Sequence, residues 1–389
     1  MRILIVTHQF PPYQFGGSGT YALDLATSLL RKGHEVVVVC GNKNPPVWEK
    51  RDRSFVLRVS VPQIPPRHLW FEITNREQIL RLARKTDVVH VQPISCSLLI
   101  RQIIRDTGKP VVATIDGSHR EILRATIHLP LPDATLSEII TSVLAEPIQT
   151  YMRDLDIRES SHLAIQSEHV KTEILSHGHP DNSSKMSIVP SAIDFNELTP
   201  ILNNDRPLSE TKNLVFVGRL FWSKGVTFAV RAMKLVAENM RERDIALSVI
   251  GEGPLKKRLA EMIQGMKLEN VVRLIGPVPR REVLKTMHAS DALVLPSLYE
   301  ACPRVLMEAK ALGLPTVLFN LPWTQGFARL GVESQLAKPM DSADLAEKML
   351  IAVRTPKREG GALDELRSFD MNAVACSLTE LYSRLTGAL

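Results

Sequence analysis

The residues best suited to binding chemistry lie in the segment PSLYEACPRVLMEAKALGLPTV, residues 296–317. A strand is expected to end at its first residue, and a loop carrying Glu300 then leads into a helix with Glu308 about one turn in. Pro303 is tolerated as a first helical residue, and Gly313 is typical of a helix end. Ligands of open α/β sheets bind outside the carboxyl ends of strands, so both carboxylates are expected there, where they suit sugar and ribose hydroxyls. The helix start offers its unpaired N–H groups to a phosphate.

A second candidate segment is FVGRLFWSKG, residues 216–225. A strand is predicted to end at Gly218, and the loop that follows carries Arg219 and Lys224 just before a helix that begins near Val226. Two cations beside a helix N-terminus form a natural anion clamp, because an arginine can grip two phosphate oxygens at once.

A third segment, PPYQFGGSG at residues 11–19, allows the backbone to approach a ligand closely through Gly16, Gly17 and Gly19. It matches neither the G-x-G-x-x-G dinucleotide fingerprint nor a Walker loop. The sequence therefore disfavours hydride transfer and nucleotide hydrolysis.

The elements that must position these residues are short apolar strands alternating with helices, which predicts parallel, doubly wound sheets in two tandem α/β domains. A polar, proline-bearing stretch at residues 200–213 is predicted to be a linker. The expected domains are residues 1–200 and 201–363, followed by a last helix within residues 364–389. The predicted strands are residues 3–6, 35–40, 87–91, 110–115, 162–166 and 186–189, then 214–217, 246–250, 271–275, 292–295 and 316–319, with helices at 20–32 and 226–239.

Composition narrows the class of protein. The 389 residues are 44% hydrophobic and carry a net charge of only +6, so a fibrous or disordered chain is excluded and no nucleic-acid partner is indicated. The four cysteines form no C-x-x-C pair, which argues against a zinc or redox site and for a reducing cytoplasm. No apolar run reaches the roughly 18 residues of a membrane span. We expect a cytoplasmic protein, at most peripheral on the inner membrane face.

Together these features resemble the retaining family 4 glycosyltransferases of the GT-B fold, in which two Rossmann-like domains face a cleft and the terminal helix commonly crosses back to the first domain. The resemblance spans nearly the whole chain. It rests on PPYQFGGSG, FVGRL-x-x-x-KG, GEGP at residues 251–254, PS-x-x-E at 296–300 and the E-x7-E pair Glu300 and Glu308.

The resemblance implies a hexosyltransferase-like enzyme whose second domain binds a nucleoside-diphosphate sugar and whose first domain binds a hydroxyl acceptor. Arg219 and Lys224 would hold the diphosphate, Glu308 the ribose and Glu300 the donor sugar, with Arg219, Lys224 and Glu300 as catalytic candidates. The other implied donor-site residues are Gly16, Gly17, Gly218, Gly251, Cys302, Arg304 and Val305.

We expect neither a metal nor another cofactor. No D-x-D pair lies near the predicted donor site. Two cations also occupy the place where a divalent metal would otherwise neutralise the diphosphate.

Some positions depart from the family pattern. The usual Thr-x-His at a strand end is Thr114-Ile115-Asp116, with His119 nearby, so Asp116 is the catalytic candidate of the first domain. The usual Pro-Asn-Gly between the domains is residues 190–192, Pro-Ser-Ala. The familiar glycine after E-x-x is Pro303, which removes one backbone N–H.

Two rival functions remain open. A nucleotide-sugar epimerase of similar fold needs a carboxylate acid/base pair in the first domain, for which Asp116 and Glu121 are the candidates. A nucleotide-sugar-binding subunit without activity would explain the departures just described. The donor base, the donor sugar and the acceptor, whether a glycan, a lipid-linked molecule or a small molecule, stay open.

One further segment, residues 50–85, holds nine Lys or Arg against three Asp or Glu, with Trp70 and Phe71 among them. It is interpreted as a solvated basic face or, alternatively, as a docking surface for anionic lipid.

Overall fold

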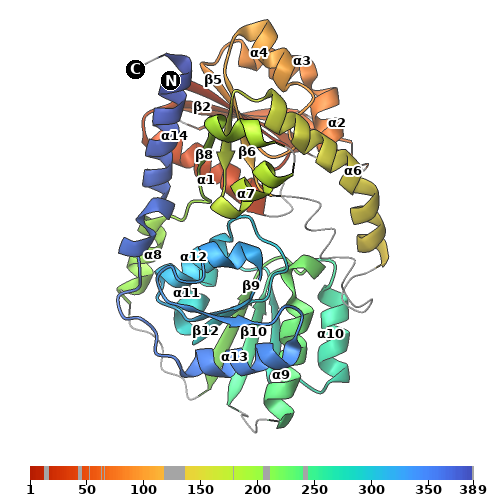
Figure 1. The fold of residues 1–389 in the computed structure, drawn as a ribbon, viewed down its shortest axis with the longest axis vertical. Helices are drawn as coiled ribbons and strands as arrows, with labels where there is room; N and C mark the ends of the chain where they lie inside the picture. The colour runs from red at the N-terminus through yellow and green to blue at the C-terminus, as the bar shows by residue number, and fades with distance from the viewer. Residues whose placement is uncertain are drawn as a thin grey trace. The chain divides into compact units, whose positions relative to one another are not determined.

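The structure is a computed structural model that describes residues 1–12, 17–42, 46–51, 53–62, 64, 66–117, 136–177, 179–204, 211–239 and 244–387. The chain divides into two compact units (Figure 1). Unit 1 comprises Met1–Arg120, Val143–Ala192 and Phe369–Leu389, and unit 2 comprises Glu121–Ser142 and Ile193–Ser368.

Unit 1 is built on an eight-stranded sheet in the order β3-β4-β2-β1-β5-β6-β7-β8. All neighbouring strands pair in parallel except β3 and β4, which form an antiparallel pair at one edge. The central strands are apolar on both faces because helices cover both, as parallel sheets require. The strands are β1 (Arg2–Thr7), β2 (Glu35–Asn42), β3 (Val47–Arg51), β4 (Ser54–Ser60), β5 (Val88–Val91), β6 (Val111–Ile115), β7 (His162–Ile165) and β8 (Met186–Ile188).

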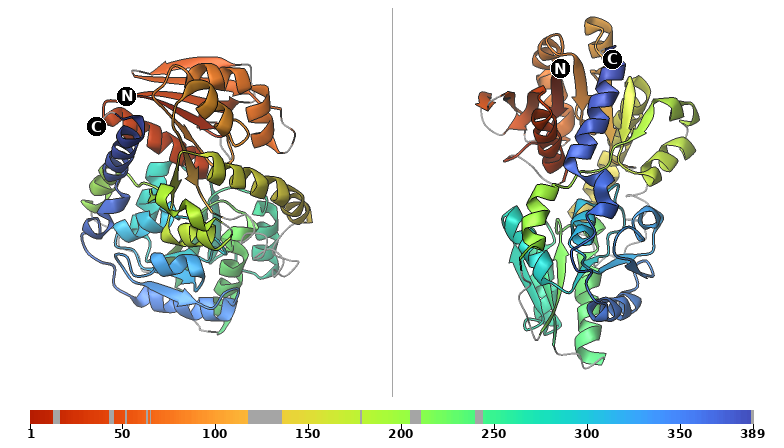
Figure 2. Two further views of the ribbon diagram at one scale, coloured as in Figure 1. Left: turned by 45° about the horizontal axis from the view of Figure 1, so that its top comes forward. Right: turned by 90° about the vertical axis from the view of Figure 1, so that its left-hand side faces the viewer.

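The helices of unit 1 come from both ends of the chain. Helix α14, drawn in dark blue, packs against α1 and supplies Val374, Leu378 and Leu381 to the same apolar core as β1 (Figure 1). The first strand and the last helix thus lie side by side (Figure 2). The helices are α1 (Gly17–Arg31), α2 (Arg67–Thr74), α3 (Arg76–Ala83), α4 (Ile100–Thr107), α6 (Leu136–Glu159, with its residues from Val143 onward in this unit), α7 (Glu168–Ser176), the 3-10 helix η2 (Pro180–Lys185) and α14 (Met371–Thr386).

A buried polar contact joins α14 to the sheet. The ring of His90 on β5 bonds through Nδ1 to the hydroxyl of Tyr382 at 2.5 Å and through Nε2 to Thr114 Oγ1 at 2.7 Å. Burial lowers the pKa of His90 to about 3, so the imidazole is neutral. Both ring nitrogens are therefore used within the fold, and His90 acts as a structural residue.

Unit 2 is built on a six-stranded parallel sheet in the order β11-β10-β9-β12-β13-β14. Its core combines apolar side chains of these strands with those of α9 and α13. Its strands are β9 (Lys212–Val217), β10 (Ile245–Ile250), β11 (Val272–Gly276), β12 (Ala292–Leu295), β13 (Thr316–Phe319) and β14 (Ser334–Ala337). Its helices are α8 (Phe195–Leu202), η3 (Trp222–Lys224), α9 (Val226–Asn239), α10 (Lys256–Gly265), α11 (Arg280–Ala289), α12 (Arg304–Ala311), η4 (Pro322–Gly326), α13 (Ser342–Arg354) and η5 (Asp364–Phe369, which ends at the boundary).

The predicted parallel, doubly wound sheets are confirmed in both units. The predicted linker at residues 200–213 is wrong at both of its ends. Helix α8 begins after Asp194, which caps it by accepting from the N–H of Asn196, and it continues to Leu202. Strand β9 already begins at Lys212. The boundary between the units falls between Ala192 and Ile193. No helix in the described part of the chain combines the length and apolar character of a membrane span.

Candidate functional site

Three loops of unit 2 meet at the carboxyl ends of β9, β10 and β12. Gly218 donates its N–H to Ile250 O at 3.0 Å, and a Cβ at Gly251 would lie 1.9 Å from Gly218 O. Gly225 adopts a φ of +67°, and a Cβ there would lie 1.9 Å from Pro296 O. Only glycine fits such close approaches. The predicted donor-site residues Gly218 and Gly251 thus hold the loops together through their backbones.

The loops place Lys224 against Glu300. Lys224 lies at the end of η3, Glu300 lies in the loop between β12 and α12, and Lys224 Nζ is 2.6 Å from Glu300 Oε1. Arg219, exposed at the end of β9, lies with its guanidinium carbon 5.0 Å from the ring centre of Phe221. The structure therefore brings together the two segments that the sequence singled out, and it pairs one cation of the predicted clamp with a predicted sugar-binding carboxylate.

Glu308 lies one turn into α12, as predicted, and its side chain is only 4% exposed. Two arginines contact the same carboxylate oxygen, Oε1: Arg304 through Nε at 2.8 Å and Arg280 through Nη1 at 2.8 Å. Arg280 also donates from Nε to Glu197 Oε2 on α8 at 2.5 Å. Burial lowers the pKa of Arg280, but Glu308 and Glu197 raise it by more, so its net pKa lies above the ordinary value and the guanidinium stays charged.

The first turn of α12 carries the remaining predicted donor-site residues. Pro303 was expected as the first helical residue. Its φ and ψ of −73° and 101° are extended, so it is the residue before the helix, which begins at Arg304. Arg304 and Val305 are half-buried at the helix start, and Cys302 is buried in the loop before it. Gly313 follows the helix with a φ of +70°, which confirms the predicted helix end.

The other predicted residues belong elsewhere. Gly17 and Asp116 lie in unit 1, where Gly17 begins α1 and Asp116 follows β6. Gly16, His119 and Glu121 lie outside the described residues.

Asp116 belongs to a buried acidic group that the sequence did not reveal. Burial raises the pKa of Asp116 to about 6, that of Asp156 on α6 to about 7, and that of Glu72 on α2 to about 8. Asp156 accepts from Ile94 N at 3.0 Å and Glu72 from Leu98 N at 2.9 Å. Low-dielectric surroundings disfavour the charged form, so Glu72 is mostly protonated at pH 7, Asp156 is partly protonated and Asp116 is mostly ionised.

His8, directly after β1, is hydrogen-bonded within the fold through both of its ring nitrogens. Its Nδ1 bonds to Ser95 Oγ at 2.8 Å and its Nε2 to Gln9 Nε2 at 2.8 Å. Burial, with a smaller contribution from His68, lowers the pKa of His8 to about 3. A neutral ring with both nitrogens occupied is poorly suited to proton transfer.

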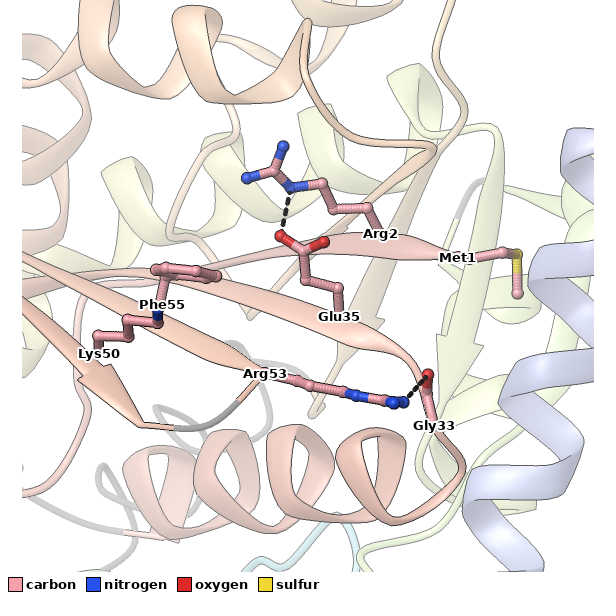
Figure 3. Close-up of a pocket in the computed structure, with 7 residues that line it drawn as sticks. All are labelled: Met1, Arg2, Gly33, Glu35, Lys50, Arg53 and Phe55. Atoms are coloured by element: carbon pink, nitrogen blue, oxygen red, sulfur yellow. Dashed lines mark hydrogen bonds and ion pairs between the residues drawn. The ribbon is translucent and has the colours of Figure 1, made fainter.

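A separate pocket of about 490 Å³ lies in unit 1 at the starts of β1, β2 and β4 (Figure 3). Arg2 pairs with Glu35 at 2.9 Å, and Arg53 donates to the carbonyl of Gly33. These are the amino ends of the parallel strands, opposite the edge where ligands of such sheets bind. We therefore do not assign this pocket to the candidate site. It is lined by Met1, Arg2, Gly33, Glu35, Lys50, Arg53 and Phe55.

Comparison with known proteins agrees with this architecture. The family profile "Glycosyltransferase Family 4" matches residues 15–197, and that of "Glycosyl transferases group 1" matches residues 202–360. A glycogen synthase of Mycobacterium tuberculosis is 26% identical over 409 residues, covering 98% of this chain and 94% of the relative.

Solved structures share the fold. Sucrose-phosphate synthase from Thermosynechococcus elongatus superposes with a TM-score of 0.79 at 17% identity, covering 100% of this chain and 99% of that chain. Anabaena Alr3699/HepE in complex with UDP-glucose superposes with a TM-score of 0.71 at 16% identity, covering 99% of this chain and 100% of the other.

Two Rossmann-like units, with carboxylates and cations gathered at the carboxyl ends of the second sheet, define an enzyme of the GT-B class. The chain belongs to the glycosyltransferases of family 4.

The buried carboxyls predict how stability depends on pH. Their folded pKa values of about 6, 7 and 8 exceed the ordinary values of 3.8 to 4.5, so these groups bind more protons in the folded state, and their contribution to stability falls as pH rises through the folded pKa values. Histidines whose pKa burial lowers act in the opposite direction, because they bind a proton more readily in the unfolded state. Their effect fades above about pH 7, where the unfolded imidazoles are largely neutral; these residues are His8, His34, His68, His90 and His162.

We expect the free energy of unfolding from urea titrations to decrease between about pH 7 and 8, where Asp156 and Glu72 lose their protons, and to decrease less in Asp156→Asn. Glu261→Gln, which changes a largely exposed carboxylate of unit 2, should keep the wild-type slope. Stability that rises across this window would contradict the assignment.

Proposed function

We propose that this glycosyltransferase transfers a sugar from a nucleoside diphosphate to a hydroxyl acceptor with retention of anomeric configuration. The observation that carries the proposal is the arrangement in unit 2. Lys224 and Glu300 are paired in the loops after β9 and β12, and the nearly buried Glu308 is fixed by Arg280 and Arg304. This arrangement offers cations for a diphosphate and carboxylates for sugar and ribose hydroxyls.

In the proposed roles, Arg219 and Lys224 hold the diphosphate, Glu300 the donor sugar and Glu308 the ribose. Lys224 and Glu300 neutralise each other in the ligand-free site, so a bound donor would draw the lysine toward its phosphates and leave the carboxylate for sugar hydroxyls. The reaction runs on one sugar face, with a donor phosphate oxygen helping to deprotonate the acceptor. The protein contributes positioning and stabilisation of the departing charge.

The acceptor is proposed to bind unit 1 near the carboxyl ends of its strands, where Asp116 follows β6. The raised pKa of Asp116, about 6, lets this carboxyl exist in either protonation state near neutral pH. It can therefore donate or accept a hydrogen bond with an acceptor hydroxyl.

A panel of UDP-, GDP- and ADP-sugars tests the proposal directly by thermal shift and by turnover with and without candidate acceptors. Binding with transfer or donor hydrolysis supports it. Binding without turnover supports the inactive subunit, and a changed sugar with no acceptor supports the epimerase. Either of these two results would overturn the proposal.

The first prediction from the proposed function concerns binding of the donor ribose. Glu308→Gln removes a charged acceptor and should weaken donor affinity by about 1.5 to 3 kcal/mol, or roughly 10- to 150-fold in Kd. Isothermal titration calorimetry with the preferred nucleotide-sugar measures this change. Glu261→Gln, on the surface of the same unit, should bind like wild type, and equal affinity of Glu308→Gln and wild type would remove Glu308 from the donor site.

The second prediction concerns charge compensation. If protein cations neutralise the leaving diphosphate, transfer should persist in excess EDTA, whereas Arg219→Met and Lys224→Met should each lower kcat about 100-fold. Steady-state kinetics measure both effects. Lys257→Met, which alters a lysine with a 91% exposed side chain on α10, is the matched control. A strict requirement for magnesium or manganese would contradict the argument.

We also propose peripheral contact between unit 1 and an anionic membrane. The proposed contact surface is smaller than the whole segment 50–85 that the sequence offered for lipid docking. Arg58 in that segment is buried and paired with Glu49 at 2.5 Å, and Phe71 is fully buried, so neither can meet lipid. On the antiparallel edge strand β3, Trp48 is 56% exposed and shares a face with the exposed Lys50. Tryptophan favours the membrane interface and lysine favours anionic headgroups.

The third prediction tests this edge, defined by Trp48, Lys50 and Arg53. Each basic residue near an anionic surface contributes about 1 kcal/mol, so Lys50→Gln/Arg53→Gln should lower vesicle partitioning roughly 30-fold. Sedimentation with phosphatidylserine-containing and pure phosphatidylcholine vesicles at low and raised salt measures it, with Lys257→Gln as control. Equal binding to both vesicle types at low salt would remove the membrane proposal and leave a soluble acceptor.

A further inference from the structure

The contacts of Glu308 are one-sided. Arg280 and Arg304 both approach Oε1, and no described residue has a recorded contact with Oε2. Oε2 is not a fully buried atom without a partner, so it is accessible to a ligand. One oxygen is thus fixed by protein and the other is left to accept from a ligand.

The two arginines do not have equal effects. Arg304 lies on α12 itself, four residues before Glu308, so it moves with the carboxylate. Arg280 comes from the start of α11 and is held on its other side by Glu197 of α8. It therefore fixes the carboxylate relative to the rest of unit 2, because its rigid planar fork binds two carboxylates from two different helices.

Arg280 also has one N–H donor group without a hydrogen-bond partner. Its Nη2 is buried and lacks a hydrogen-bond partner, although Nε and Nη1 are both engaged. A buried N–H without an acceptor is costly, and a ligand oxygen arriving beside Glu308 would satisfy it.

We infer that Arg280 is a positioning residue of the donor site, which holds Oε1 of Glu308 so that Oε2 meets a ribose hydroxyl of the nucleotide. The inference rests on the proposed function, in which Glu308 binds the ribose. It adds a residue, remote in sequence from the E-x7-E pair, that sets how strongly the enzyme distinguishes ribose from deoxyribose.

The test compares nucleotides that differ by one hydroxyl. The nucleoside diphosphate that binds wild type best is titrated calorimetrically beside its 2′-deoxy and 3′-deoxy analogues. Wild type should prefer the ribonucleotide over at least one analogue by about tenfold or more, since a hydrogen bond to a charged group is lost. In Arg280→Met that ratio should fall to within about threefold of unity, while affinity for the same deoxy analogue changes little.

Two further variants sharpen the test. Arg281→Met changes the exposed neighbour on α11 and should keep the wild-type ratio. Arg280→Lys keeps the charge but cannot bind both carboxylates through a fork, so it should give an intermediate ratio. Thermal unfolding of each variant shows whether it is folded.

The outcomes separate two failures. If Arg280→Met binds the ribonucleotide and its deoxy analogue more weakly by the same factor, the ratio of the two affinities is unchanged. Arg280 is then merely structural, which overturns the inference. If wild type binds no nucleoside diphosphate, or if it and Glu308→Gln show the same ribose preference, the proposed role of Glu308 fails first. Loss of the ratio in both Glu308→Gln and Arg280→Met, but not in Arg281→Met, supports the inference.

Discussion

A carboxylate withdrawn from water must be neutralised, and this constraint organises the candidate site of unit 2. Glu308 is almost fully buried, and an unpaired charge in such a place would carry a large desolvation penalty. Two guanidinium groups from α11 and α12 meet this requirement, and Glu197 compensates the excess positive charge. The packing of α8, α11 and α12 and the chemistry of the site are therefore parts of one electrostatic arrangement.

Much of the fold could be predicted because its strands are short, apolar and buried on both faces. Strands β12 and β13 and helix α9 have the predicted bounds. Strands β3 and β4 were not predicted. Strand β3 is an exposed edge strand with charged residues and lacks that apolar signal, whereas β4 is mostly buried but carries Arg58 within its apolar residues. Strand β14 was also not predicted, because its four residues, Ser-Gln-Leu-Ala, form no apolar run. Helix α8 was not predicted, and Pro200 inside it was interpreted as part of the linker.

The site was predictable only where its residues share a local motif. Arg219 and Lys224 lie in the segment after β9, and Glu300 and Glu308 lie in the segment after β12. Both strands end at the same sheet edge, so the convergence of these residues follows from topology. The direct pairing of Lys224 with Glu300 depends on the conformations of the two side chains, which the spacing of residues in the sequence does not predict. Arg280 lies 28 residues before its partner Glu308, and no motif marks it. The acidic group of unit 1 is likewise assembled from separate elements, and its raised pKa values come from burial, which a sequence does not display.

The membership of α14 in unit 1 has a consequence for how the protein is made. Unit 1 combines β1 (Arg2–Thr7) with side chains of α14 (Met371–Thr386) in one apolar core, so this core stays incomplete until α14 has been synthesised. On the ribosome, the segments Met1–Arg120 and Val143–Ala192 of unit 1 emerge early, but part of their apolar surface stays uncovered until α14 is made. Every segment of unit 2 has emerged once Ser368 is out, so this unit can close first. The second unit in chain order can therefore finish folding before the first, and a nascent chain stalled before residue 371 would expose a surface that chaperones bind.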